Sequence, residues 1–540
     1  MKTLKYTLAF TALFMFTGCG DHFLDINVDP NNPSKVALGQ LLTNAQLTMT
    51  NSMTMGNNGI STPASILVHQ TVQRGSVDQY FVSGNDVQIQ NVWQNLYSGA
   101  LEDYKTIIDQ GTAGKSLHYV GIAQVLSAYT FSILVDLWGD VPYSEALNPT
   151  KFIYPHYDDD ATIYPQLIAL LDQGIENLSA DSPDVPGSDD LIYGGDLEKW
   201  TRLANTIKLK LYNQTRLVGD VSPDVNKLLS GGSLMKNDGD FELAYGTSIS
   251  PNDRNPVFFL EYTLGNRPTY ISPYFYEILN DKHTFHNNLI LSGIKDPRVP
   301  YYWFNQLTDP TQAQNPTEYT DANGFVSIFF SSQGVNQGFV QDKSQTVLGL
   351  YPMGGRYDDG KGGVVNTTAT NGTVTGPGNV AQRLLPYFNS LYIQAELALT
   401  EPGVSGDPRA LFASAMQASF DKVNAIATAA SVPTIPNSAQ NSYMNAVLSK
   451  YDAGSDDKKL ELILTEKWIA SFGFALDSYS DYRRTGYPVM YDPNTDNIPF
   501  TQTSRQYPVS LAYSATALNL NFNSPGQKNV TTDRVFWDPN

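Results

Sequence analysis

Long segments of helical periodicity recur along this chain and constrain its fold more than any other feature. In each segment apolar residues return every three or four positions for about 15 to 20 residues, as on one face of a helix. One segment opens at Leu38, and the others span residues 91–109, 119–138, 164–178, 199–218, 383–399, 409–425 and 459–472. These segments tend to come in pairs, and a helix pair must stack on its neighbours to bury its apolar face. The sequence therefore predicts a mainly α fold with a paired-helix scaffold over residues 36–245 and 381–475.

The region between the two helical blocks, residues 245–380, has a different composition. Residues 310–380 contain 12 glycines and many Thr, Asn and Gln residues, which makes long helices improbable there. Long irregular stretches inside compact proteins are commonly functional. We therefore predict a loop-rich, few-stranded overlay at 245–380 that holds the ligand-binding part. The last residues, 476–540, are expected to form an irregular tail.

The start of the chain has the layout of a secretory signal. Lys2 and Lys5 precede an apolar run at 6–16 and a small-residue stretch that ends at Cys19, the single cysteine. The segment resembles a bacterial lipobox, with Phe16 where leucine is usual. It predicts that residues 1–18 are a lipoprotein signal peptide, that Cys19 carries the lipid anchor, and that 19–540 form a single mature domain. An ordinary signal with a chance cysteine is the alternative.

Charge and motifs exclude several classes of function. The 53 acidic residues outnumber the 34 basic ones, for a net charge of −19, so no nucleic-acid partner is expected. Neither a Gly-x-Ser-x-Gly elbow nor a His-Glu-x-x-His metal motif occurs, and His283 and His286 lack a third ligand nearby. No catalytic residue, cofactor or metal site is therefore predicted. A glycosidase needs only two facing carboxylates, and the sequence alone does not exclude such a pair.

An ordered series of short motifs resembles the SusD/RagB family of outer-membrane nutrient-binding lipoproteins, specifically its second SusD-like branch. The motifs are Phe23–Asn27, Asp29–Pro33, Asp136–Tyr143, Asp190–Asp196 with Lys199–Trp200 and Ala204–Asn205, Asp296–Arg298, Gln394–Glu396, Glu466–Ala470, Asp481–Pro488, Tyr507–Pro508 and Val535–Asp538. They cover nearly all of the mature chain, and residues 300–380 match least well.

The resemblance implies both a fold and a function. It implies a scaffold of tetratricopeptide-like helix pairs, a SusD-like α/α superhelix, under a loop-rich part. It implies a palmitate-bearing lipoprotein on the extracellular side of the outer membrane, seated as a lid on a TonB-dependent SusC-like transporter. Asp21 and Asp25 resemble the acidic surface-export signals of such proteins. Its implied role is to capture oligosaccharides or peptides and hand them to the transporter without chemistry.

Ligand contacts vary within this family, so we choose candidates from residue chemistry. An aromatic face beside a guanidinium or amide can hold a sugar or a peptide group. The candidates are Arg74, Tyr80 and Phe81, which precede the helix near residue 91, together with Tyr319 and Phe325 from the irregular region. Each choice requires that the aromatic face be exposed.

Other motif residues are expected to be structural. Glu396 lies on an apolar helix, so if buried it needs a basic partner. We predict that it pairs with Arg483 or Arg484, and that Trp468 and Trp537 belong to the core. Three functions remain in view: a non-catalytic nutrient-binding lid, an anchored glycan hydrolase and a purely structural envelope protein.

Overall fold

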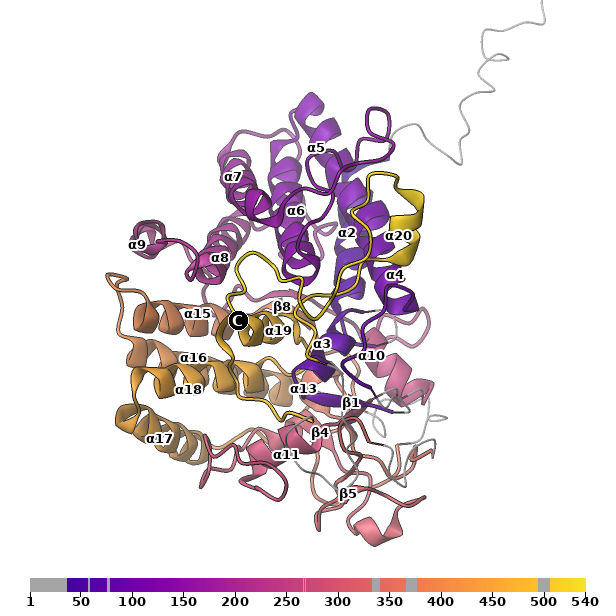
Figure 1. Ribbon diagram of the computed structural model, residues 1–540, viewed down its shortest axis with the longest axis vertical. Coiled ribbons are helices and arrows are strands. Elements are labelled where there is room, and N and C mark those ends of the chain that lie inside the picture. Colours follow the sequence, from indigo (N-terminus) through magenta and orange to yellow (C-terminus); the bar gives the residue numbers. More distant parts are fainter. Residues whose placement is uncertain are drawn as a thin grey trace, which may run out of the picture.

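The structure is a computed structural model that describes residues 36–56, 59–74, 78–265, 267, 269–332, 340–365, 376–493 and 506–540. The predicted signal peptide 1–18 lies outside the described residues, as do the predicted lipid anchor Cys19 and the acidic residues Asp21 and Asp25. Two groups of long helices and one loop-rich part make up the described chain (Figure 1).

The first helix group comes from the N-terminal half of the chain, and its long helices fill the upper part of Figure 1. Its members are α2 (Leu38–Met53), α3 (Ser61–Leu67), α4 (Val87–Asn95), the π-helix η2 (Leu96–Leu101), α5 (Glu102–Gly114), α6 (Leu117–Trp138), α7 (Asp160–Ser179), α8 (Leu197–Thr215) and α9 (Ser222–Gly231). Consecutive long helices are neighbours: α5 packs on α6, α6 on α7, and α7 on α8. This antiparallel stacking confirms the predicted paired-helix scaffold.

Helix α6 is the central helix of this group. It is long and apolar enough to span a membrane, but every residue of its most apolar window is buried inside the protein. All side chains from Tyr119 to Trp138 are buried, which explains why the sequence shows apolar residues around the whole helix. We therefore describe α6 as a core helix.

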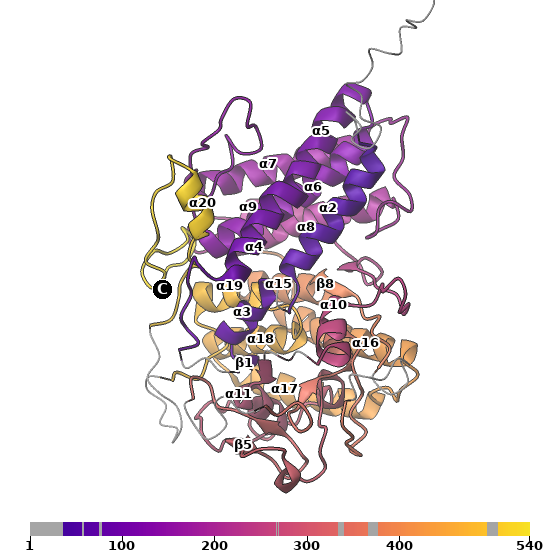
Figure 2. The ribbon, with the colours of Figure 1, turned by 90° about the vertical axis from the view of Figure 1, so that its right-hand side faces the viewer.

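The second helix group follows the loop-rich part in the sequence and lies below the first group, as both views show (Figures 1 and 2). It contains α15 (Tyr387–Thr400), α16 (Pro408–Ala429), α17 (Asn437–Ala453), α18 (Asp456–Ala470) and α19 (Leu476–Thr485). Helix α15 packs on α16, α18 and α8, so it joins the two groups. Helix α19 contacts α3, α6 and α18.

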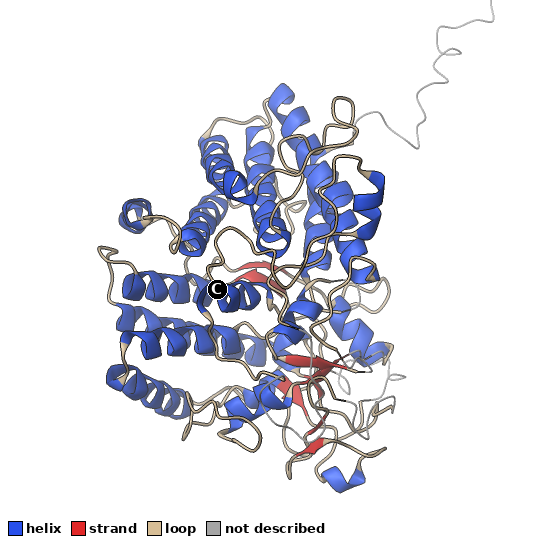
Figure 3. Ribbon diagram, viewed as in Figure 1, coloured by secondary structure: helices blue, strands red, loops and turns tan. Residues whose placement is uncertain are grey.

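The intervening part is loop-rich with short strands, as predicted (Figure 3). Its elements are β2 (Phe241–Leu243), α10 (Pro256–Phe258), η3 (Phe259–Thr263), β3 (Thr269–Ile271), α11 (Pro273–Asn280), α12 (Val299–Tyr302), β4 (Trp303–Phe304), η4 (Pro310–Gln312), β5 (Tyr319–Thr320), β6 (Val326–Ser327), β7 (Val347–Leu348) and α13 (Leu350–Met353). The described strands form antiparallel pairs, including β1 (Thr71–Gln73) with β3 and β2 with β8 (Gln382–Leu385).

Several segments differ from the sequence-based expectation. The helix predicted from 383 begins only at Tyr387, because Leu385 precedes Pro386 and a residue before proline avoids helical backbone. Helix α17 was not predicted, since its apolar face is narrow. The predicted irregular tail 476–540 is wrong over α19 and over α20 (Ala515–Leu520). Most of the buried positions of α19 hold polar or charged residues, so its sequence lacks the apolar stripe from which a helix is predicted.

Buried ion pairs hold the helix groups together, and they involve the motif residues. The carboxylate of Glu396 accepts hydrogen bonds from Arg484 of α19 and from Arg216 just after α8. Burial opposes the charge of Glu396, but the two guanidiniums hold its pKa below the usual carboxyl range. The predicted pairing of Glu396 with an arginine of the C-terminal motif is therefore confirmed, with Arg484 as the partner.

A second network centres on Arg298 of the Asp-Pro-Arg turn. Its guanidinium contacts Asp296 at 2.6 Å and Glu466 of α18 at 2.9 Å, and all three side chains are buried. Trp468 and Trp537 are buried as well, which confirms their assignment to the core. The motif residues thus position the scaffold, and ligand contacts must be sought elsewhere.

Candidate functional site

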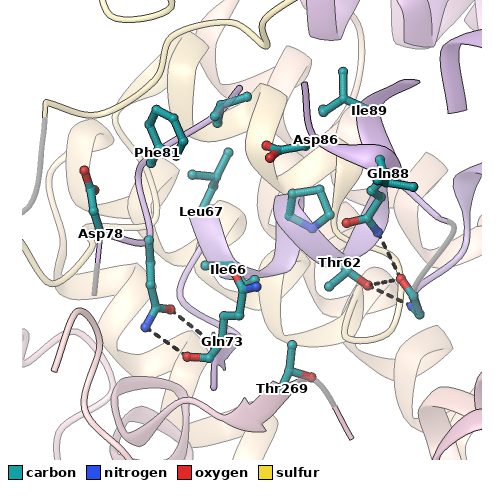
Figure 4. A pocket seen from close by; sticks show the side chains of 15 residues that line it. Thr62, Ile66, Leu67, Gln73, Asp78, Phe81, Asp86, Gln88, Ile89 and Thr269 are labelled. Carbon is teal, nitrogen blue, oxygen red and sulfur yellow. Dashed lines mark hydrogen bonds between the residues drawn. The ribbon is translucent and has the colours of Figure 1, made fainter. Parts of the chain in front are cut away.

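A cavity of about 410 Å³ opens where α3, β1, the start of α4 and β3 meet (Figure 4). Pockets for small ligands typically occupy about 300–1,000 Å³. The described lining residues combine several amide and hydroxyl groups, two carboxylates, aliphatic side chains and one phenyl ring. They are Gly56, Thr62, Pro63, Ile66, Leu67, Gln73, Asp78, Gln79, Phe81, Val82, Asp86, Val87, Gln88, Ile89 and Thr269.

Side-chain to backbone hydrogen bonds fix the polar walls of this cavity. The Gln79 carboxamide accepts from the backbone N–H of Gln73 at 2.9 Å and donates to the Gln73 carbonyl at 3.3 Å. Across the cavity, Gln88 donates to the carbonyl of Gly56 at 2.9 Å, and Thr62 bonds both backbone groups of Gly56 (Figure 4). Through these bonds Gln79, Gln88 and Thr62 are each tied to the backbone of the cavity wall.

Tyr80 ties the Phe81 loop to the core behind the cavity. Its side chain is buried, and its hydroxyl lies 2.9 Å from Nε2 of His69. The His69 ring stacks on Phe330 with ring centroids 4.2 Å apart. Burial lowers the pKa of His69 to about 3, partly offset by Asp492, so the ring is neutral at physiological pH. The neutral ring serves as packing and hydrogen-bonding support.

The segment that leads into this site is anchored to α18. Trp468 donates its indole N–H to the carbonyl of Val68 at 2.9 Å, and Gln70 donates to the carbonyl of Trp468 at 2.7 Å. Both bonds are buried, and they connect residues about 400 positions apart in the chain. The C-terminal helix group therefore fixes where α3 ends and β1 begins.

The chemistry of the cavity suits a neutral, hydroxyl-rich ligand. The described lining residues include no Lys, Arg or His, and the charged groups present are the carboxylates of Asp78 and Asp86. These lie on opposite sides of Phe81 in the view of Figure 4. Carboxylates and amides bind hydroxyl groups, and the half-exposed Phe81 ring offers an apolar face. The arrangement can hold a sugar ring without a cation.

The structure separates the five predicted ligand residues. Phe81 is half-exposed and lines the cavity, and the partly buried Arg74 directly follows the lining residue Gln73. Tyr80, Tyr319 and Phe325 are buried, so the expectation of exposed aromatic faces is wrong for these three. Their burial follows from partners that are remote in sequence, which composition does not reveal.

Tyr319 and Phe325 belong to an aromatic cluster of the loop-rich part. The Tyr319 hydroxyl donates to Glu277 at 2.7 Å, and the Phe325 ring stacks on Tyr276 with centroids 3.8 Å apart. This cluster fixes the loops around α11. The lining residues that were not predicted include all the amides and hydroxyls, and these carry no motif: Gln73, Gln79, Gln88, Thr62 and Thr269.

Metal chemistry has no support in the described part of the chain. Within those residues, no three His, Cys, Asp or Glu side chains gather closely enough to hold a metal ion. His283 and His286 are neighbours with ring centroids 5.4 Å apart, but their nearest carboxylates, Asp281 and Glu277, face them separately at 3.5 and 3.4 Å.

Comparison with protein families gives one match over most of the chain. The second SusD-like family model, described as starch-binding associating with outer membrane, matches residues 30–514. A search of curated proteins finds no match.

Several solved structures are similar over nearly their whole length. A chitin-binding protein is 20% identical, with a TM-score of 0.68, over 93% of this chain and 100% of that chain. A chitin-binding SusD homologue from Flavobacterium johnsoniae is 18% identical, with a TM-score of 0.63, over 92% and 99%. A SusD/RagB family protein from Bacteroides thetaiotaomicron is 21% identical, with a TM-score of 0.61, over 94% and 99%. At these identities the likeness establishes the fold.

Proposed function

The chain belongs to the SusD-like family of starch-binding proteins that associate with the outer membrane, and from this premise we propose its particular role. It is a non-catalytic lipoprotein on the cell surface that captures an oligosaccharide nutrient and passes it to a TonB-dependent, SusC-like outer-membrane transporter. The observation that carries this proposal is the cavity beside Phe81, in which an exposed aromatic face meets amides, hydroxyls and carboxylates.

A glycan suits this cavity better than a peptide does. Peptide ligands are commonly held by main-chain pairing along an exposed strand edge or by an apolar groove. Here the short strand β1 already pairs with β3, and the walls present side-chain amides and hydroxyls. The similar chitin-binding proteins are consistent with a saccharide ligand. We retain a peptide as the alternative ligand.

An apolar surface beside the first helix group supports the transporter partnership. We define the 153–522 surface as Ile153, Tyr154, Leu520 and Phe522, whose exposed fractions are 74%, 40%, 71% and 81%. Tyr154 and Phe522 touch, with ring centroids 4.7 Å apart, and Asn523 donates to the Tyr154 carbonyl at 2.6 Å. Apolar groups gathered on a surface in this way commonly mark a protein interface. Helix α20 carries part of this surface (Figure 2).

The tether is proposed from the sequence at the chain's start. Acylation at Cys19 after removal of residues 1–18 would hold the protein at the outer membrane, and each buried CH₂ of the acyl chains contributes about 0.8 kcal/mol. Metabolic labelling with a palmitate analogue tests this step. Label is expected on the wild-type protein and not on the Cys19→Ala variant, and an unlabelled wild-type protein would contradict the anchor.

The binding step is tested by titration calorimetry together with product analysis. Purified protein is titrated with chito-oligosaccharides, malto-oligosaccharides and neutral peptides, and each mixture is then analysed chromatographically. We expect heat of binding from a glycan series and an unchanged ligand after long incubation. Binding of peptides but of no glycan would show that the ligand is the alternative, a peptide.

Asp78 and Asp86 allow the non-catalytic assignment to be tested directly, because a hydrolase would need a pair of carboxylates in the cavity. We expect no product from the wild type or from the Asp78→Asn and Asp86→Asn variants. Product that forms with the wild type and disappears in either variant would establish a glycan hydrolase.

A further inference from the structure

A second cavity, of about 680 Å³, lies in the loop-rich part at the end of α16 and next to α13. Its lining residues combine two guanidiniums with a tyrosine ring, aliphatic side chains and glycines. They are Thr247, Ile249, Arg254, Leu350, Gly355, Arg356, Tyr357, Asp359, Gly376, Pro377, Ala430 and Val432. None of them lines the cavity beside Phe81.

The two arginines of this cavity have aromatic and neutral partners. The guanidinium carbon of Arg356 lies 4.0 Å from the ring centroid of Phe304, and its nitrogens reach the carbonyls of Gly363 and Gly362 at 3.3 and 3.5 Å. Arg254 donates to Asn252 at 2.8 Å and lies 5.3 Å from the Phe258 ring. In the part of the chain that the structure describes, neither guanidinium forms an ion pair with a carboxylate.

Arg216, Arg298 and Arg484 form ion pairs with carboxylates, whereas Arg383 and Arg483, like the two arginines of this cavity, bond to neutral acceptors. Arg383 and Arg483 are buried against backbone carbonyls, however, whereas Arg254 and Arg356 line a cavity. The cavity also contains Asp359, whose carboxylate forms an ion pair with Lys361 at 2.8 Å. Hydrogen bonding to Lys361, together with the charges of Lys361 and Arg356, holds the pKa of Asp359 low. Two guanidiniums thus face the cavity with capacity for an anion, and a guanidinium suits a carboxylate geometrically.

The remaining walls fit the ring of a sugar. Tyr357, Leu350 and Val432 supply apolar faces, and Thr247 supplies a hydroxyl. Gly376 must stay without a side chain, because a Cβ there would lie 2.4 Å from the carbonyl oxygen of Gly355. Gly376 and Gly355 are therefore in close backbone contact within this wall.

We propose that this cavity is a second glycan-binding site, specific for the carboxylate of an acidic sugar residue such as a uronate. The proposal rests on the glycan-binding function proposed above and adds to it a substrate class and a separate site. Arg254 and Arg356 bind the carboxylate, and the tyrosine and aliphatic wall contacts the sugar ring.

The test compares a short oligogalacturonate with its fully methyl-esterified form, which has the same rings without the charge. Titration calorimetry at low salt is expected to show binding of the acid that is at least about tenfold tighter than binding of the ester. Raising the salt to about 0.3 M should reduce this preference, because exposed charges are screened. Equal binding of acid and ester would overturn the proposal.

Variants locate the site. Arg254→Gln and Arg356→Gln are each expected to weaken acid binding by about tenfold or more and to leave ester binding unchanged. The matched control is Arg409→Gln. It removes an exposed arginine at the start of α16 that pairs with Asp452, and it should leave the binding of both acid and ester unchanged. Melting temperatures identify a misfolded variant. Arg356 also packs on Phe304, so Arg356→Gln could lose stability. In that case the binding result of Arg254→Gln alone decides whether the proposal holds.

Two further arms separate this proposal from the general function. One outcome is that neutral glycans bind the wild type, bind Phe81→Ala more weakly, and bind no less tightly than the acid. The proposed function would then stand, and the proposal of an acidic-sugar site would be wrong. If an aspartate-rich peptide binds through Arg254 and the oligogalacturonate does not, the acidic-sugar assignment is wrong. Retention of the acid preference in Phe81→Ala would show that the two cavities bind independently.

Discussion

Glu396 in α15 and Arg484 in α19 form an ion pair in which both side chains are 0% exposed, although 88 positions separate them in the sequence. Arg216 contacts the same carboxylate at 3.0 Å, and Asn213 donates to it at 2.9 Å. One carboxylate therefore links helices from the N-terminal and C-terminal parts of the chain. The carboxylate of Glu396, the two guanidiniums and the amide of Asn213 are all buried together.

The first prediction concerns this carboxylate. Glu396→Gln leaves two buried guanidiniums without their shared partner, and breaking a buried pair in this way costs about 3–5 kcal/mol. We expect a loss of that size in the free energy of unfolding, measured by urea denaturation. Asp452→Asn, which breaks the exposed pair with Arg409, serves as the control and should cost less than about 1 kcal/mol. Equal stability of Glu396→Gln and wild type would contradict the structural role.

The second prediction concerns acid sensitivity at His69. Its folded-state pKa of about 3 lies below the unfolded value of 6.5, so the unfolded chain binds the proton first as the pH falls. The contribution of His69 to stability is therefore complete above pH 6.5 and declines as the pH falls toward 3, by about 1.4 kcal/mol per pH unit.

The measurement uses His69→Asn, because asparagine tolerates the left-handed backbone that His69 adopts at φ 54°. The difference in unfolding free energy between wild type and variant is expected to shrink by about 2 kcal/mol from pH 7 to pH 5. His156→Asn, at a side chain that is 67% exposed, is the control. A difference that does not change with pH would show that His69 keeps its ordinary pKa.

The third prediction concerns the aromatic face in the cavity. Phe81→Ala removes a half-exposed ring, so we expect about tenfold weaker binding of a neutral glycan and little change in melting temperature. Phe522→Ala makes the same change at a ring outside the cavity, and glycan affinity should not respond. Full affinity in Phe81→Ala would place the glycan elsewhere.

The fourth prediction concerns the 153–522 surface. Replacing Leu520 and Phe522 by Asp puts charges where an apolar interface would form, so co-purification with the co-expressed transporter should fall strongly. Val185→Asp changes an exposed apolar residue away from this surface and should leave co-purification intact. Undiminished co-purification of the double variant would remove this surface from the interface.

The scaffold could be predicted from the sequence because its signal is local. Residues 164–178 and 199–218 show helical periodicity on their own, and the structure has α7 and α8 there. Helix α19 was missed because Asp477, Asp481 and Arg484 are buried through ion pairs with remote partners, which makes its sequence look like a surface segment. Local patterns do not report such pairing.

The candidate site was only partly predictable for a related reason. Phe81 and Tyr80 are adjacent aromatics, yet one faces the cavity and the other bonds to His69 inside the core. Residue type gives no means to distinguish them, because exposure is decided by segments that arrive from elsewhere. The amides Gln73 and Gln79 gave no signal, since their importance lies in the hydrogen bonds between them.

The paired bonds between Trp468 and the segment Val68–Gln70 have a consequence for biogenesis. The residues that line the cavity beside Phe81 lie between Gly56 and Ile89, apart from Thr269, but the partner Trp468 is made near the end of synthesis. A chain cut short before α18 would carry the complete set of lining side chains and still lack the two bonds that hold the end of α3 and the start of β1. The shape of this cavity would thus depend on the integrity of nearly the whole polypeptide.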